Sequence, residues 1–349
     1  MIIKINWIRQ FLMGLTTALG LNLILMSGSA WGQGSSEPTT FKSAPTGTVI
    51  NQFGKNSMNL CIPALEQAYP NGIKISNLHQ PWMDGDYLNT QKIPYVKGNV
   101  SNGESVFKTT LTNQTRHFRG NGIPTHNTGI FPVVPRTQAY NIYHGALGDN
   151  AEHPTADLIP IEPYDLDITV NRNPIYSSTP YCMESLVVGV ATQTHAVWHA
   201  NIANTDGADN HWVDPIAALP MDQCWGHPYN KEYHYHGYSW RCFPDQGNAN
   251  EHSPLMGYAM DGFGIFGPRG ENGIMVQNAD LDECHGHFGV IEWDSVLVYM
   301  YHYHLNNEYP YGPGCFRSQQ TYYDAISNAH THVPMRSLVK GPNEKLFAH

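Results

Sequence analysis

A motif of rare residues occurs twice in the second half of the chain, and this repeat restricts the fold more than any other feature. The tetrapeptide Tyr-His-Tyr-His lies at 233–236 and again at 301–304. Each copy sits inside a longer pattern, Cys-x-Gly-His, spacer, Tyr-His-Tyr-His, spacer, Cys-Phe, which spans 224–243 and 284–316. Chance would rarely repeat these residues in this order. We therefore interpret the pattern as an internal duplication that forms a pseudo-symmetric pair.

The tetrapeptide predicts a cluster of imidazoles if it is a strand. Side chains two residues apart in a strand point to the same face, so each copy presents two histidines on one face and two tyrosines on the other. The histidine that ends each Cys-x-Gly-His segment can supply a third ligand. The expected metal ligands in the repeat are His227, His234, His236, His287, His302 and His304. The sequence does not decide between two mononuclear sites and one shared site.

Three imidazoles with an open position suit zinc or copper, and both rank ahead of iron. The alternative is a metal-free network of Tyr and His side chains. Buried imidazoles need partners in either case, because an unpaired buried polar group is costly. We expect a metal, zinc or copper, because the two His-x-His pairs lie in matched contexts.

The chain is rich in Gly and Pro, with 32 and 24 residues, and turn signals separate its short apolar segments. Such sequences favour short strands over long helices. We predict a mainly β fold, an antiparallel sandwich or barrel-like structure with long loops and a duplicated, histidine-rich C-terminal half. The expected strands are 165–170, a central strand at 186–191, a hairpin over 255–266 that turns at Asp261-Gly262, and 296–304.

The N-terminus has the pattern of a secretory signal peptide over residues 1–30. Lys4 and Arg9 precede an apolar run at 11–26, and small residues follow it. An uncleaved membrane anchor is the alternative, but the run is shorter than the ~20 apolar residues of a spanning helix. We expect a periplasmic or secreted protein that has no membrane association after cleavage. A polar leader at 31–50 and an N-terminal β region of hairpins at 51–117 follow.

The net charge of −10 gives no reason to expect nucleic acid as a partner, since a phosphate backbone attracts clustered Lys and Arg. Bound metal ions are the expected partners, and the sequence identifies no protein partner.

An even number of cysteines in an exported chain indicates disulfides. The six cysteines allow fifteen pairings, and a zinc-binding Cys/His set is the alternative. From the repeat we expect each copy to be closed by one disulfide. The expected pairs are Cys224–Cys242, Cys284–Cys315 and, by elimination, Cys61–Cys182.

Two carboxylates are candidate catalytic residues. Asp261 lies at the expected hairpin turn and Glu283 directly precedes a repeated cysteine. Either carboxylate can orient a metal-bound imidazole or act as general base to a metal-bound water. The alternative for Asp261 is ordinary turn chemistry, because Asp-Gly is a favoured turn pair.

Six stretches within residues 118–318 resemble the YHYH-domain family, namely 121–126, 188–191, 234–237, 252–263, 281–287 and 301–316. The resemblance implies an exported bacterial domain over 118–318, with 319–349 as a C-terminal extension. It adds His126 and His252 as candidate metal ligands. His285 occupies a position at which the family pattern has Asn. The resemblance implies no particular reaction.

Three functions are consistent with these features. The first is a non-catalytic protein that captures, stores or carries zinc or copper. The second is a metal-dependent enzyme, a hydrolase or an oxidoreductase. The third is a metal-free structural surface domain. Motifs of serine hydrolases, zincins and nucleotide-binding loops are absent from the sequence.

Overall fold

The computed structural model describes residues 38–44, 49–50, 73–74, 81–146, 160–183, 185–204, 212–229 and 231–320. The predicted signal peptide, Cys61 and the extension beyond residue 320 lie outside these residues, and the 51–117 region is described in part. The chain divides into two compact units, and all described residues belong to Gly34–His349. In this part of the chain no helix has the length and apolar character needed to cross a membrane.

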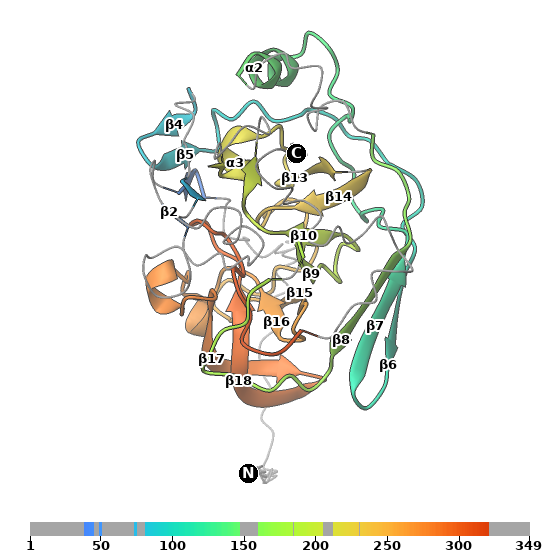
Figure 1. Cartoon of the computed structure of the whole chain (residues 1–349), viewed down its shortest axis with the longest axis vertical. Coiled ribbons are helices and arrows are strands. Elements are labelled where there is room, and N and C mark those ends of the chain that lie inside the picture. The colour runs from blue at the N-terminus through green and yellow to red at the C-terminus, as the bar shows by residue number, and fades with distance from the viewer. Residues whose placement is uncertain are drawn as a thin grey trace, which may run out of the picture. The chain divides into compact units, whose positions relative to one another are not determined.

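One open sheet of eight strands carries both copies of the repeat (Figure 1). The predicted central strand, β9, lies in its middle, and all four of its residues are buried. In spatial order the strands are β13 (Gly226–Tyr229), β14 (Glu232–Tyr235), β10 (Val197–His199), β9 (Val187–Val190), β15 (Leu255–Ala259), β16 (Gly264–Phe266), β18 (Val296–His304) and β17 (Gly286–Trp293).

The two halves of this sheet have the same order of pairings. β9 and β15 pair antiparallel in the middle, and each pairs with the next strand along the chain, β10 or β16. These strands pair in parallel with β14 and β18, the two strands that carry the tetrapeptide. β13 and β17 complete the halves as antiparallel edge strands. The sheet is therefore mixed, with two parallel pairs in a mainly antiparallel structure.

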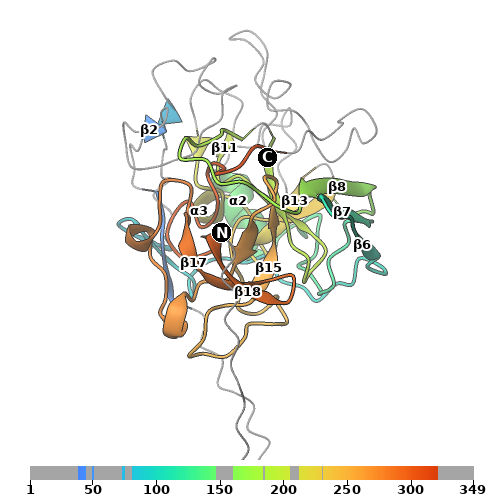
Figure 2. The ribbon, with the colours of Figure 1, turned by 90° about the horizontal axis from the view of Figure 1, so that it is seen from below.

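The expected mainly β fold is confirmed. A three-stranded antiparallel sheet lies beside the large one (Figure 2). It contains β6 (Phe107–Leu111), β7 (Thr115–Gly120) and β8 (Leu166–Asn171). The other strands are β1 (Thr40–Lys42), β2 (Val49–Ile50), β3 (Ile73–Lys74), β4 (Met83–Asp84), β5 (Tyr87–Asn89), β11 (Ala203–Asn204) and β12 (Trp212–Val213). The helices are α2 (Gln138–Ala146), α3 (Pro215–Ala218) and the 3-10 turns η2 (Glu271–Gly273) and η3 (Asn278–Asp280).

The smaller sheet packs against the large one through aromatic side chains, as in a sandwich. Phe118 of β7 stacks on Tyr258 of β15 with ring centroids 5.6 Å apart. The guanidinium of Arg116 lies 4.6 Å from the centre of the Tyr258 ring and 4.7 Å from that of Trp293. An ion pair of 2.8 Å with Asp294 balances its charge. This packing places the smaller sheet over the part of the large sheet that contains Tyr258 and Trp293.

The turns follow ordinary backbone chemistry. The hairpin of β17 and β18 has a two-residue loop, Asp294-Ser295, in which both residues have positive φ. Two positive φ angles match the twist of a two-residue hairpin, and short polar residues tolerate them. The same principle places Gly85, at φ 60°, in the turn between β4 and β5.

Candidate metal centre

The paired strands bring three histidines of each half to one face of the sheet. In the antiparallel pair β13–β14, His227 lies directly opposite His234. In β17–β18, His287 lies opposite His302 in the same way. Directly opposed residues share a face and have neighbouring Cβ atoms. The histidine of the Cys-x-Gly-His segment therefore reaches the His-x-His pair, as expected.

The first cluster consists of His227, His234 and His236. The Nε2 atom of His236 lies 3.2 Å from Nε2 of His227 and 3.1 Å from Nε2 of His234. All three side chains are buried, with at most 1% of their surface exposed. Three ring nitrogens thus converge at one buried position.

The second cluster contains four histidines. Nε2 of His304 lies 3.1 Å from Nε2 of both His287 and His302. Nε2 of His252, in the loop before β15, lies 3.0 Å from that of His302. His302 and His304 are buried, whereas His252 and His287 are half-buried. His252, which the family resemblance indicated, is therefore part of this cluster.

Hydrogen bonds between the rings do not account for the second cluster. The Nδ1 atoms of His252, His302 and His304 each face a backbone carbonyl, at 2.8, 3.2 and 2.7 Å. A carbonyl only accepts, so Nδ1 must carry the hydrogen and the Nε2 atom of a neutral ring has a lone pair. Three lone pairs would then point at one another across about 3 Å, and such an arrangement is stable around a cation.

The distances agree with metal coordination. Ligands at 2.0–2.1 Å from a tetrahedral zinc ion lie about 3.3 Å from one another. Five Nε2 pairs, two in the first cluster and three in the second, lie 3.0–3.2 Å apart. In the described part of the chain, the two clusters form separate groups of ligand atoms that could each hold an ion. Two sites are therefore favoured over one shared site.

Burial favours the neutral form of three rings of the second cluster. Desolvation, followed by the neighbouring imidazoles, lowers the pKa of His302 to about 3 and holds the pKa of His304 well below its usual value. Desolvation also lowers the pKa of His252. Neutral imidazole is the form that binds metal ions. These rings are thus ready to act as ligands at neutral pH.

The rings of the first cluster have polar neighbours behind them. Nδ1 of His236 lies 3.2 Å from the side-chain oxygen of Asn201. The ring of His199 stacks on that of His234, with centroids 3.7 Å apart and an angle of 16°. Nε2 of His199 lies 2.7 Å from Oε1 of Glu232, and both residues are buried. Such outer contacts orient metal-binding histidines.

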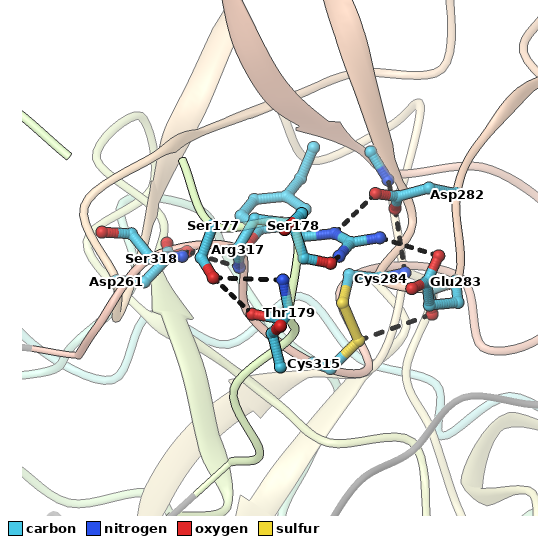
Figure 3. Close-up of a disulfide and its surroundings, with 12 residues drawn as sticks. Ser177, Ser178, Thr179, Asp261, Asp282, Glu283, Cys284, Cys315, Arg317 and Ser318 are labelled. Carbon is cyan, nitrogen blue, oxygen red and sulfur yellow. Dashed lines mark hydrogen bonds and ion pairs between the residues drawn. A yellow bond between two sulfur atoms is a disulfide. The ribbon is translucent and has the colours of Figure 1, made fainter. Parts of the chain in front are cut away.

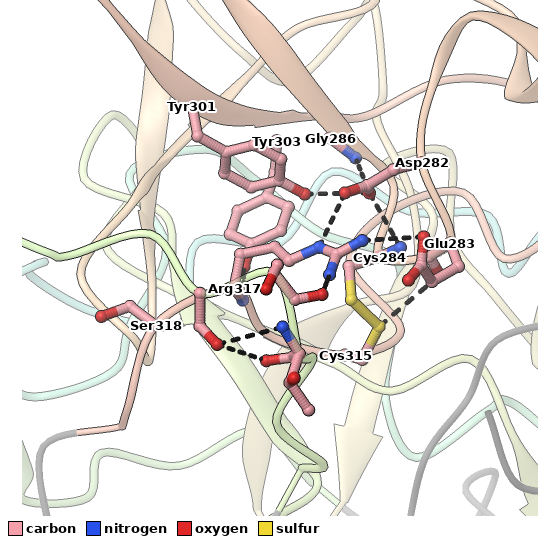
Figure 4. A network of polar contacts seen from close by, with 12 residues as sticks. Asp282, Glu283, Cys284, Gly286, Tyr301, Tyr303, Cys315, Arg317 and Ser318 are labelled. Atoms are coloured by element: carbon pink, nitrogen blue, oxygen red, sulfur yellow. Dashed lines mark hydrogen bonds and ion pairs between the residues drawn. A yellow bond between two sulfur atoms is a disulfide. The ribbon is translucent and has the colours of Figure 1, made fainter.

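The tyrosines of the repeat lie on the opposite face, where each phenol hydroxyl has a partner. Those of Tyr233 and Tyr301 donate to Asp222 and Asp282, each at 2.9 Å. The Tyr301–Asp282 contact is visible in Figure 4. The glycine of each Cys-x-Gly-His segment lies under the ring of this tyrosine, so a Cβ there would collide with it. This collision explains the glycine in both copies.

Asp261, a candidate catalytic base, lies on the tyrosine side. Its carboxylate accepts from the Tyr303 hydroxyl at 2.7 Å and from the backbone N–H groups of Phe263, Arg317 and Ser318. Burial raises its pKa to about 6 despite these donors. The structure places Asp261 away from both imidazole clusters, as a buried acceptor that fixes the chain after β18.

Glu283, the other candidate base, also lies outside the clusters. It forms an ion pair of 2.7 Å with the guanidinium of Arg317, which binds Asp282 at the same distance (Figure 3). Arg317 thereby holds the segment before the second Cys-x-Gly-His against the segment that follows Cys315. Both carboxylates thus belong to the tyrosine side.

The two disulfides expected from the repeat are confirmed. Cys224 is bonded to Cys242 and Cys284 to Cys315. Cys182 is also disulfide-bonded, and its expected partner Cys61 lies outside the described residues. No described cysteine is free. The alternative of thiolate zinc ligands therefore does not hold for these five positions.

His126, the remaining candidate ligand, is not brought to either histidine cluster. Its Nδ1 bonds to the Asn127 carbonyl and its Nε2 accepts from the Tyr235 hydroxyl at 2.5 Å. The sulfur of Cys224 lies 3.4 Å away but belongs to a disulfide. His126 is thus a partner of the tyrosine face.

His285 lies outside the second cluster. It has a φ of 71°, and its ring bonds to the His304 carbonyl and to Asn278. Trp225, at the corresponding place in the first copy, also has a positive φ, of 58°. Asn is enriched among residues with this backbone conformation. The Asn of the family pattern thus fits a backbone requirement.

Several residues around the clusters were not expected from the sequence. The sequence could have indicated Glu232, because it lies two residues before His234 and so shares its face. It could also have indicated Asp222, since extending the repeat upstream gives Asp-x-Cys-x-Gly-His in both copies. No sequence pattern indicates His199, because only the parallel pairing of β10 with β14 brings it to the site.

Comparison with known proteins identifies one family. Residues 167–275 match the model of a family described as YHYH protein. The match includes the first tetrapeptide and ends before the second. It lies within the 118–318 region in which the resemblance was expected. No curated protein and no solved structure matches the chain.

Proposed function

We propose that this chain is an exported protein that binds two transition-metal ions, zinc or copper. Its residues 167–275 match the YHYH protein family. Each ion is held by one histidine cluster. The proposed role is capture, storage or transport of the ion.

One observation carries this proposal. In the second cluster three rings donate from Nδ1 to carbonyl oxygens and direct their Nε2 lone pairs toward one another. A purely structural network would pair each of these acceptors with a donor, because an unsatisfied buried polar group is costly. A bound cation provides the shared partner, and imidazole nitrogen suits zinc and copper.

Other features support the export and the duplication. Two disulfides fit a secreted or extracellular protein, because such bonds persist in oxidising compartments. The equal order of strand pairings in the two halves is what a duplicated unit would produce. The positions of Asp261 and Glu283 away from the imidazoles favour binding over catalysis, since neither carboxylate reaches the rings.

Metal content measured by elemental mass spectrometry tests the proposal. The purified protein, saturated with zinc and dialysed, should contain two equivalents. The variant with His234→Ala and His236→Ala should retain one, as should the variant with His302→Ala and His304→Ala. The variant with all four changes should retain none.

His117→Ala is the matched control, because His117 lies on β7 and pairs with Asp167 outside both clusters. It should keep both ions. Less than about a tenth of an equivalent in the wild-type protein, or two full equivalents in the fourfold variant, would refute the proposed function.

A further inference from the structure

The two clusters lie at different depths. The three rings of the first are buried, whereas His252 and His287 of the second are half-buried. His287 belongs to an edge strand, β17, and His252 to a loop. The exposed carboxylate of Glu271 lies beside this cluster and interacts with His252. The second cluster therefore has a solvent side, which the first lacks among the described residues.

The residues behind the rings also differ. β10 and β16 pair with the tetrapeptide strands in the same register, so His199 of the first half corresponds to Phe266 of the second. By the same correspondence, Glu232 of β14 matches Met300 of β18. An ionisable pair in one half thus takes the place of two apolar side chains in the other.

The buried pair affects the charge that the first cluster can hold. Three neutral imidazoles around a divalent ion leave two positive charges in a low-dielectric interior, which is unfavourable without a nearby anion. Glu232 places a carboxyl group there, and a bound cation would favour its ionised form. Both it and His199 have 3% of their side chains exposed. His199 connects Glu232 to the cluster, because its ring bonds to Glu232 and stacks on the ring of His234.

We propose that the two sites are functionally unequal. The first retains its divalent ion, with Glu232 and His199 as positioning and charge-balancing residues. The second exchanges its ion through the side formed by His252, His287 and Glu271. This inference rests on the proposed function, since it requires that both clusters bind metal.

The rate of zinc transfer to a chelator tests the inference. Protein loaded with two equivalents of zinc is mixed with excess 4-(2-pyridylazo)resorcinol, and the absorbance of its zinc complex is followed. Two phases of about one equivalent each are expected, with rates at least tenfold apart. The variant with His302→Ala and His304→Ala should lose the fast phase and keep the slow one.

Glu232→Gln should speed the slow phase about 10- to 100-fold, the usual effect of losing an outer contact of a metal site, and leave the fast phase unchanged. Met300→Gln, at the corresponding position of the second half, is the matched control and should change neither rate. The two phases of the wild-type protein test the inference even if Glu232→Gln fails to fold.

The outcomes separate the proposals. Two equivalents of zinc released in a single phase would overturn the inequality of the sites. A slow phase that Glu232→Gln leaves unaltered would overturn the role of Glu232, and either result leaves the proposed function standing. A wild-type protein that takes up no zinc would overturn both.

Discussion

The two faces of the tetrapeptide strands are equally buried and yet differ in how their polar groups are satisfied. On one face, each phenol hydroxyl has a partner: three donate to carboxylates and one to His126. On the other face, imidazole acceptors converge on one another. The tyrosine face is therefore complete as a protein structure, whereas the second histidine cluster leaves converging acceptors that a cation could complete. Hydrogen-bond satisfaction, and not burial, distinguishes the structural face from the functional one.

The two faces should respond to pH in opposite directions in the metal-free protein. Burial raises the pKa of Asp261 from 3.8 to about 6, so its contribution to stability is present below 3.8 and lost as pH rises through 6. Burial lowers the pKa of His302 from 6.5 to about 3, so its contribution is lost as pH falls below 6.5. At about 1.4 kcal/mol per pKa unit, the effect is on the order of 3 kcal/mol for Asp261 and on the order of 5 kcal/mol for His302.

Urea unfolding of metal-free protein between pH 4 and pH 7 measures both effects. Relative to the wild-type protein, Asp261→Asn should lose stability on acidification, because the gain from protonating Asp261 is removed. His302→Gln should lose less stability on acidification than the wild-type protein, because the variant lacks the buried ring whose lowered pKa favours unfolding at acidic pH. Equal pH profiles for the two variants would show that the faces do not differ in this way.

The tyrosine face should contribute to stability and not to metal binding. Tyr303→Phe removes a hydroxyl that donates to Asp261 and accepts from the backbone N–H of Arg317. Since one partner is charged, we expect a loss of about 1.5 to 3 kcal/mol in unfolding free energy. Tyr235→Phe removes a bond to a neutral ring, His126, and should cost about 1 kcal/mol.

Both tyrosine variants should bind two equivalents of zinc. Denaturant unfolding of the metal-free proteins and metal analysis of the loaded proteins check the two statements separately. Loss of an equivalent from either variant, with its fold intact, would mean that the tyrosines take part in the sites.

Local features of the fold were predictable, since they depend on short-range periodicity. The strand Val296–His304 has its predicted bounds because it is rich in β-branched and aromatic residues. The pairing of two imidazoles within each strand follows from the two-residue period. The disulfides followed from the repeat, because the cysteines enclose each tetrapeptide.

The surroundings of the site depend on contacts between distant segments and were not predictable. Asp261 was a candidate base because it precedes a glycine at a turn, but its partners Tyr303 and Arg317 come from β18 and the segment that follows it. His199 reaches the first cluster through the parallel pairing of β10 with β14, and no sequence pattern near His199 predicts that pairing. The two-residue spacing of histidines in a strand identifies the candidate ligands of such a site. The residues that surround these ligands are determined by packing between segments distant in the sequence.

The most direct test of the central claim, that each histidine cluster coordinates a metal ion, is an anomalous difference map. Crystals of zinc-loaded protein measured at the zinc absorption edge should show two peaks. Each peak should lie about 2.0–2.1 Å from the Nε2 atoms of at least three histidines of one cluster. A map with no peak at the convergence of His227, His234 and His236, and none among His252, His287, His302 and His304, would contradict the account.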